Sequence, residues 1–326
     1  MRASSIVASL LLKLMAFAAV VGSNTSVAQD YPTKPLRMVI PFTAGGPTDL
    51  QGRLYADRLN SALHQPVVVE NRPGAGGMIG AEAVTRAPAD GYSLLLGSAT
   101  TVYAPLVMPA PINPLKDLAP VALVSFIPLT LFAHADVPAK TLQELVAYGR
   151  SNPEKLNLGV ASFGGSDHLA GELLNARAGT KVLTVVPYKG AAPILQDLVT
   201  GRIELIITTL AAVRDHVDSG KVRALAGIQS TRSPFLPAVP TIAESYPGYD
   251  VPTWNAVWTT PGTPAGIVAR LTAEFQALLQ NQEVIAKLRG LSYVPMYGNA
   301  AQLAAKMHDD YERIAKLVRD AGIKAQ

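Results

Sequence analysis

Three times, this chain runs from an apolar segment of β type through a glycine turn into a helical pattern. Such a junction brings unpaired backbone N–H groups and the positive end of a helix dipole to one point, which suits an anion. Glycine lets the backbone approach a ligand closely and tolerates a positive φ. If two junctions belong to one half of the molecule and one to the other, an anion fits between the halves. The junctions lie at 38–49, 67–78 and 158–168.

Apolar runs of four to seven residues alternate with helical patterns of ten to fifteen, which predicts an α/β chain of βαβ units with mostly parallel sheets. Strands are expected at 36–41, 66–70, 92–97, 121–126, 129–133, 156–161, 182–186, 203–208 and 222–227. Helices are expected at 49–63, 141–150, 166–178, 191–200, 264–280, 282–289 and 299–321, with no strand among the last three. The helix at 49–63 should carry Leu50, Leu54, Leu59 and Leu63 on one side.

The proline-rich stretch 233–264 is typical of a crossover between domains. We therefore expect a discontinuous domain 1 (31–130 plus 250–326) and an inserted domain 2 (131–249), with a hinge where the chain crosses near 130 and 250. Trp254 and Trp258 lie in the return crossover, where they serve either core and hinge packing or the lining of a cleft.

The N-terminus has the pattern of a secretory signal peptide at 1–28. Arg2 and Lys13 accompany an apolar stretch at 14–21, and Ser26-Val27-Ala28 gives a small-x-small site for cleavage after Ala28. The apolar core is shorter than the ~20 residues of a membrane span, which disfavours an uncleaved anchor. The 298 remaining residues suffice for two domains, and we expect the mature protein in a bacterial periplasm.

Composition excludes several classes of function. Removal of the leader lowers the formal charge from +4 to +2, and there is no Lys/Arg run, so a nucleic-acid partner is not expected. The chain has no cysteine, which removes thiol catalysis and Cys-ligated zinc. The five histidines show no metal-ligand spacing, so we expect neither a metal nor a cofactor.

The first turn suits a carboxylate, which the N–H groups around Thr43 to Gly46 and the Thr43 hydroxyl would contact. It is equally well explained as a tight strand–helix loop. Thr48 or Gly46 would cap the helix, with Gln51 as the capping-box partner of Thr48. Asp49 is awkward beside an anion, and three roles remain open for it: contact through water, orientation of the loop, or pairing with a polar donor of the ligand.

The second turn contains Gly-Ala-Gly-Gly-Met-Ile-Gly at 74–80, whose spacing departs from a dinucleotide fingerprint. In the third turn, Ser166, Asp167 and His168 resemble hydrolase residues, but neighbours at i and i+2 of a helix point to different sides and form no nucleophile–base pair. Ser166 is either a helix cap or a hydroxyl donor to the ligand, and His168 is either a packing residue or a ligand-side donor. Tyr188-Lys189-Gly190 offers a fourth loop at the cleft.

Ordered motifs cover nearly the whole mature chain. They are Tyr31-Pro32-Thr33-Lys34-Pro35-Leu36-Arg37 with Pro41-Phe42-x-x-Gly45-Gly46-x-x-Asp49, then 69–81, His168-Leu169-Ala170-Gly171-Glu172-Leu173, Val186-Pro187-Tyr188-Lys189-Gly190, 220–226 and Pro240-Thr241-x-Ala243-Glu244. As an ordered set they resemble the periplasmic solute receptors of tripartite tricarboxylate transport, the TctC or Bug-type family. The resemblance implies a two-lobed periplasmic-binding-protein fold of type II, whose cleft closes on a small organic acid.

Carried over by motif, the resemblance implies ligand contacts at Phe42, Thr43, Ala44, Gly45, Gly46, Asp49, Ala75, Gly76, Gly164, Gly165, Ser166, His168, Tyr188 and Thr208. Many members place an aspartate where this chain has Thr208, and its absence disfavours an amino-acid ligand. The resemblance also implies delivery of the ligand to the membrane permease subunits of a tripartite tricarboxylate-type transporter, with the receptor acting as a monomer and without catalysis. A receptor that reports to a sensor and an exported hydrolase are the alternatives.

Overall fold

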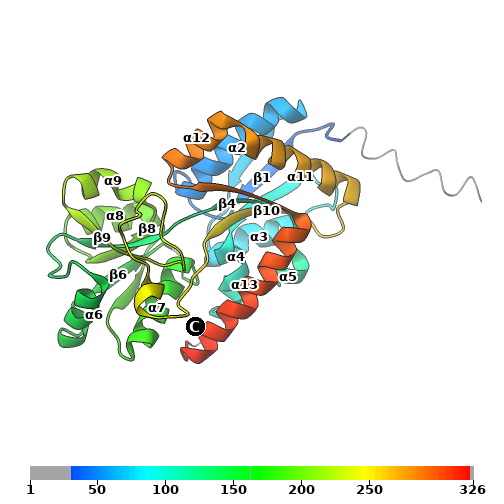
Figure 1. Ribbon diagram of the computed structural model, residues 1–326. Helices are drawn as coiled ribbons and strands as arrows, with labels where there is room; N and C mark the ends of the chain where they lie inside the picture. Colours follow the sequence, from blue (N-terminus) through cyan, green and yellow to red (C-terminus); the bar gives the residue numbers. More distant parts are fainter. Residues whose placement is uncertain (1–30, 162, 324–326) are drawn as a thin grey trace, which may run out of the picture.

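The computed structural model describes residues 31–161 and 163–323, which form two α/β lobes side by side (Figure 1). The first lobe is built on a six-stranded sheet of order β11-β4-β10-β3-β1-β2, and the second on a five-stranded sheet of order β7-β6-β8-β5-β9. The expected signal peptide at 1–28 lies outside the described residues. No helix of the described ranges is long and apolar enough to cross a membrane.

The elements alternate along most of the chain. The strands are β1 (Leu36–Ile40), β2 (Val67–Asn71), β3 (Ser93–Ser98), β4 (Ala119–Phe126), β5 (Thr130–His134), β6 (Asn157–Val160), β7 (Thr184–Pro187), β8 (Leu205–Thr208), β9 (Val222–Gly227), β10 (Trp254–Thr259) and β11 (Val294–Asn299). The helices are α2 (Pro47–Leu63), α3 (Met78–Thr85), α4 (Ala99–Tyr103), α5 (Pro114–Asp117), α6 (Leu142–Ser151), α7 (Ser166–Ala178), α8 (Ala191–Val199), α9 (Leu210–Asp218), α10 (Ile242–Ser245), α11 (Ala265–Gln280), α12 (Gln282–Gly290) and α13 (Ala300–Asp320), with short 3₁₀ turns η1 (Ala75–Gly77) and η2 (Ala104–Leu106).

The nine predicted strands are confirmed as β1 to β9, within two residues at each end, and the last three helices as α11 to α13. The expectation that no strand lies among those helices is wrong, because β11 pairs with β4 at the sheet edge. The proline-rich crossover also contains β10, which lies between β3 and β4. All six residues of β10 are buried, so its apolar character belongs to a central strand.

Both sheets are mixed. The βαβ segments β1–β3 and β6–β8 pair in parallel, as the alternating pattern predicted. The strands beside the crossovers run the other way: β10 is antiparallel to β3 and β4, and β5 is antiparallel to β8 and β9. The two sheets confirm a two-lobed α/β fold. The domain limits near 130 and 250 stay a prediction, and they fall between strands of different sheets.

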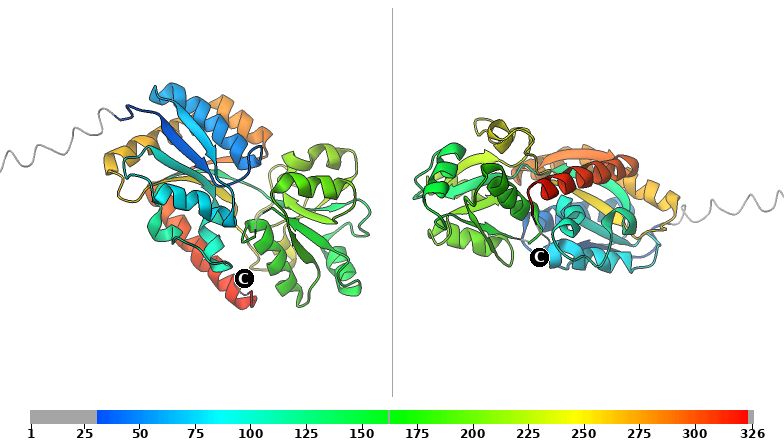
Figure 2. Two further views of the ribbon diagram at one scale, coloured as in Figure 1. Left: turned by 180° about the vertical axis from the view of Figure 1, so that it is seen from behind. Right: turned by 90° about the horizontal axis from the view of Figure 1, so that it is seen from below.

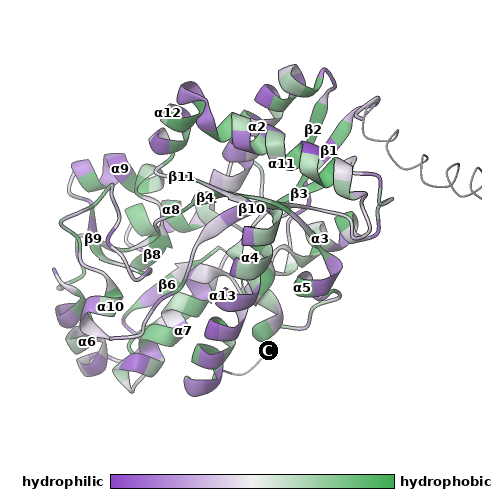
Figure 3. Cartoon of the chain, turned by 45° about the vertical axis from the view of Figure 1, so that its right-hand side comes forward, coloured by the Kyte–Doolittle hydropathy of each residue, from purple (hydrophilic) through white to green (hydrophobic). Residues whose placement is uncertain are grey.

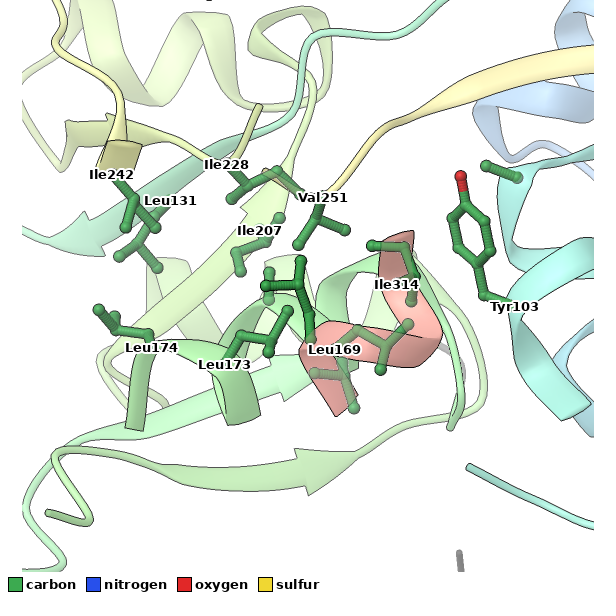
Figure 4. Close-up of a cluster of buried hydrophobic side chains, with 14 of the residues drawn as sticks. Tyr103, Leu131, Leu169, Leu173, Leu174, Ile207, Ile228, Ile242, Val251 and Ile314 are labelled. Carbon is green, nitrogen blue, oxygen red and sulfur yellow. The ribbon is translucent and has the colours of Figure 1, made fainter. Parts of the chain in front are cut away.

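Hydrophobic residues concentrate in the strands, whereas the helices mix hydrophobic with hydrophilic positions (Figure 3). One buried cluster spans the junction of the lobes. In it, Leu169 of α7 packs below Leu131 and Ile207 of the second sheet, and Ile314 of α13 reaches the same cluster beside Val251 (Figure 4). The C-terminal helix of the first lobe therefore contributes to the core between the lobes.

Two connections cross between the lobes (Figure 2). Backbone hydrogen bonds join them, directly and through Ile228, which follows β9. The N–H of Ile127, in the β4–β5 connection, donates to the Thr253 carbonyl at 3.0 Å. The N–H of Ile228 donates to Leu129 O at 3.1 Å, and the N–H of Val251 donates to Ile228 O at 3.1 Å. The two connections are thus held together by backbone hydrogen bonds and do not run independently.

Candidate ligand-binding cleft

A cavity of about 980 Å³ lies between the lobes. Its walls include the loops that follow β1, β2 and β3 in the first lobe and β6, β7 and β8 in the second. Ligands of open α/β sheets bind at the carboxyl ends of the strands, and here six such ends converge on one space. All three glycine junctions of the sequence contribute residues to this space, as predicted.

The first loop presents backbone donors to the cavity. Gly46 is the N-cap residue of α2, which confirms one of the two predicted caps. Thr48 lies inside the helix, so the predicted capping box of Thr48 with Gln51 is wrong. Among the described residues, the N–H groups of Thr43 and Ala44 and the Thr43 hydroxyl have no hydrogen-bond partner, although these residues line the cavity. They are therefore available to an anion at the start of α2.

Asp49 lies behind this loop and holds its shape. Its carboxylate accepts from the N–H of Gly45, from Arg53 Nε and from Asn71 Nδ2, each at 2.9 Å. Burial alone would raise the pKa of Asp49, but the hydrogen bonds from Arg53, Gly45 and Asn71 lower it overall. Of the three roles left open by the sequence, this geometry corresponds to orientation of the loop. The N–H of Gly45 is thereby withdrawn from the ligand.

Gln51 is fully buried instead of capping the helix. Its Nε2 donates to the Tyr55 hydroxyl at 2.7 Å and to Ser125 Oγ at 2.9 Å, and its Oε1 accepts from Asn255 Nδ2 at 2.5 Å. This polar cluster ties α2 to β4 and β10. A buried amide needs such partners, and here they fix the helix whose N-terminus faces the cavity.

The second loop is a left-handed turn. Gly74, Ala75, Gly76 and Gly77 have φ values of 126°, 47°, 62° and 92°. Only glycine adopts such values freely, and Ala75 is the one exception in the run. A Cβ at Gly76 would lie 2.8 Å from Ala104 Cβ and 3.3 Å from the Phe163 carbonyl of the other lobe. Gly76 therefore permits both the turn and the close approach of the lobes.

The third loop begins α7, whose N-cap residue is Gly165. Ser166 is the first helical residue, so its predicted role as a cap is wrong. Its N–H donates to Thr100 Oγ1 at 3.3 Å, and the two hydroxyls lie 3.4 Å apart. Thr100 belongs to α4 in the first lobe, so this pair joins the two walls of the cavity.

Asp167 and His168 brace the same loop. Asp167 accepts from the N–H of Ala161 at 2.6 Å, and burial raises the pKa of its carboxyl to about 6. Nδ1 of His168 accepts from the N–H of Gly164 at 3.3 Å, the ring packs on Phe163, and burial lowers the pKa of His168 to about 4. Among the described residues, no hydrogen bond joins His168 to Ser166, so the hydrolase geometry is not formed.

Threonines supply the remaining hydroxyls of the second lobe. Thr208 ends β8, and Thr209 is the N-cap residue of α9 without a cap bond from its side chain; within the described residues neither hydroxyl has a hydrogen-bond partner. The Tyr188 hydroxyl already donates to Asp197 Oδ2 at 2.8 Å. A Cβ at Gly190 would lie 3.0 Å from Thr43 Oγ1 of the other lobe, which places the two lobes in contact on this side too.

The cavity lining contains most of the residues implied by the family resemblance. These are Phe42, Thr43, Ala44, Gly45, Gly46, Ala75, Gly76, Gly165, Ser166, Tyr188 and Thr208. Asp49, Gly164 and His168 are not in the lining. Sequence reasoning did not single out Ser98, Thr100 and Thr209, which also line the cavity. A signal for the first two was present, since Ser-Ala-Thr directly follows a predicted strand.

The described residues include no cluster of three or more His, Asp or Glu side chains that could hold a metal ion. Of the described residues that line the cavity, Lys189 is the one Lys or Arg, and it is exposed. The cavity therefore offers recognition by N–H and hydroxyl donors rather than by clustered cations.

A family model described as the tripartite tricarboxylate transporter family receptor, TctC, matches residues 52–323. The chain belongs to this family. The resemblance predicted from the sequence motifs is thereby confirmed, and TctC proteins are a family of solute-binding receptors.

Three solved structures resemble this TctC-family chain over nearly its whole described length. The periplasmic binding protein BugD is 36% identical, with a TM-score of 0.83, over 91% of this chain and 100% of BugD. An R. palustris protein solved with adipate is 34% identical, with a TM-score of 0.84, over 91% of this chain and 100% of that chain. MatC from Rhodopseudomonas palustris, with bound malate, is 33% identical, with a TM-score of 0.82, over 88% of this chain and 100% of MatC.

Proposed function

We propose that this protein is a periplasmic receptor that captures a small organic carboxylate in the cleft between its lobes. The observation that carries the proposal is the convergence of six loops at strand ends on one cavity, with unpartnered N–H and hydroxyl groups from both lobes. These groups replace the water shell of a carboxylate. The adipate and malate bound by two similar proteins support the choice of a carboxylate.

Closure of the lobes follows from the same geometry. The Thr100–Ser166 pair and the approach of Gly190 to Thr43 join the lobes across the cavity. A ligand that contacts both walls favours this closed arrangement, because it gains interactions that an open form does not provide. The closed form is the state that we expect a membrane permease of the tripartite tricarboxylate type to recognise.

The test is thermal unfolding of the mature protein after removal of copurified ligand, with adipate, malate, citrate and benzoate. At a ligand concentration of 100 times Kd, stabilisation of about 2.7 kcal/mol is expected, which for a chain of this length corresponds to a Tm rise of roughly 4 °C. The neutral amides of the same acids should give no rise. Absence of a rise with every acid, or conversion of a bound acid to product, contradicts the proposal.

Export and delivery are tested separately. We expect the protein recovered from a periplasmic fraction to begin at Gln29, after cleavage at Ala28, and a mass measurement of the mature chain checks this. Uptake of labelled ligand by cells carrying the cognate permease should require this protein. Uptake that is unchanged after deletion of the receptor contradicts delivery while leaving ligand binding intact.

A further inference from the structure

The side chain of Met108 contacts two of the glycine loops, one from each lobe. Met108 follows η2 in the first lobe, where its N–H donates to Ala104 O at 3.1 Å. A Cβ at Gly164, in the loop after β6 of the second lobe, would lie 3.1 Å from Met108 Sδ. A Cβ at Gly76, in the first lobe, would lie 3.3 Å from the same sulfur. The thioether therefore packs against both glycines and joins the lobes at this point.

The contact leaves no spare room around the sulfur. Val107 Cγ2 would lie 3.4 Å from a Cβ at Gly164, and the Phe163 carbonyl oxygen would lie 3.3 Å from a Cβ at Gly76. Because carbon atoms in optimal contact are about 3.5–4.0 Å apart, not even a methyl group fits beside the sulfur without displacement. An atom added to the sulfur on this side therefore requires the lobes to part.

Met108 is also one of the few sulfur groups that solvent can reach. The chain has no cysteine, and five methionines follow the expected leader. Met38, Met78 and Met307 are at most 2% exposed, whereas Met108 and Met296 are half-buried. Met108 lines the cavity, and Met296 lies in β11. A mild oxidant therefore meets two accessible thioethers in the described chain, and one of them joins the lobes.

We infer that Met108 is a site of oxidation by peroxides and that its sulfoxide opposes closure of the lobes. The sulfur lone pair attacks one peroxide oxygen, and the S–O bond forms as the O–O bond breaks. For hydrogen peroxide, the departing hydroxide takes the proton of the transferred oxygen and leaves as water. The thioether is oxidised by two electrons and the peroxide is reduced.

The sulfoxide changes the contact from apolar to polar. Its oxygen keeps its water only when the lobes stay apart, and burial without a hydrogen-bond donor is costly. Methionine sulfoxide reductases restore the thioether, so the change is reversible. The expected effect on ligand affinity rests on the proposed function, whereas the oxidation itself does not.

The first experiment locates the oxidation. Ligand-stripped protein is treated with dilute hydrogen peroxide, and peptide mass spectrometry follows each methionine. We expect Met108 and Met296 to form sulfoxide roughly tenfold faster than the three buried methionines. A saturating carboxylate should slow oxidation of Met108 roughly tenfold, because the closed lobes cover its sulfur, and should leave the rate at Met296 unchanged. Met108 that stays reduced while Met296 reacts overturns the inference.

Matched variants test the effect on closure. After peroxide treatment, the Kd of wild type and of Met296→Leu should rise roughly tenfold, because apparent affinity falls with the fraction of protein that can close. A methionine sulfoxide reductase should restore the original Kd. Met108→Leu keeps a similar apolar volume without a thioether, so its own Kd should be the same before and after peroxide. Thermal melting checks that the oxidised proteins remain folded.

The outcomes separate this inference from the proposed function. The rise in Kd should be the same for every acid that binds, because closure is common to all ligands. An unchanged Kd in wild type that carries the sulfoxide at Met108, or a factor that differs widely between acids, overturns the role in closure and leaves a carboxylate receptor in place. Failure of every acid to bind the reduced protein overturns the proposed function and the effect on affinity together, while the mass spectrum still decides whether Met108 is oxidised.

Discussion

Replacing Asp167 by asparagine should change how the stability of this protein depends on pH. The Asp167 carboxyl is held at the start of α7, where it accepts from the N–H of Ala161. Burial raises its pKa from 3.8 to about 6, a shift of about 2 units. At 1.36 kcal/mol per unit, the ionised carboxylate disfavours the folded state by about 3 kcal/mol at neutral pH.

The sign follows from proton counts. Between pH 3.8 and 6, the folded protein keeps the proton of Asp167 and the unfolded chain releases it, so the stability of the wild type falls as pH rises. The neighbouring His168 acts in the opposite direction, because burial lowers its pKa from 6.5 to about 4. Its contribution to stability rises over nearly the same interval, and the two effects almost cancel in the wild type.

Asp167→Asn removes one of these effects and keeps an oxygen that accepts from Ala161. We expect the free energy of unfolding of the variant, relative to wild type, to rise by about 3 kcal/mol between pH 3.5 and pH 7. Urea unfolding at a series of pH values measures it. His168→Gln is the matched control and should give the opposite trend. A difference between variant and wild type that stays constant across this range refutes the reasoning.

Three further substitutions test the site. Ser166→Ala should weaken carboxylate binding by roughly 1–3 kcal/mol in calorimetry, with little change of Tm, since Ser166 does not cap α7; unchanged affinity would exclude a ligand contact. Asp49→Asn should raise the Kd for the carboxylate and lower Tm, because an amide oxygen accepts the hydrogen bond from the Gly45 N–H more weakly than a carboxylate does. A variant with the Kd and Tm of the wild type would contradict the role of Asp49 in orienting the loop. Trp254→Phe should cost about 1–3 kcal/mol in urea unfolding, because Asp310 loses its 2.8 Å indole donor, and an equally stable variant would contradict that role.

Local patterns in the sequence predicted most of the architecture. Strands β1 to β9 and the C-terminal helices were found because their apolar periodicity is set by burial on a sheet or a core. Strand β10 was missed because it follows Pro252 and precedes Pro261, so that composition suggested a crossover. Its strand character depends on pairing with β3 and β4. Both strands lie more than a hundred residues earlier in the sequence, and β3 is the more distant of the two.

The candidate site was predictable only in part. Glycine turns identify backbone donors, so the loops around Thr43, Gly76 and Ser166 were placed at the cavity. The direction of a side chain in the first turn of a helix was not predictable. The sequence therefore did not show that Asp49 and His168 lie behind their loops rather than in the cavity lining.

The hydrogen bonds between the two connections bear on how the receptor opens to release its ligand. Since Ile127 is hydrogen-bonded to Thr253, and Leu129 to Ile228, the two connections bend together. We expect the lobes to move by bending about these paired connections, because sliding one connection along the other would break the hydrogen bonds between them. We therefore expect one hinge coordinate to describe opening, and distances from several pairs of labels across the cleft should then change in proportion to one another.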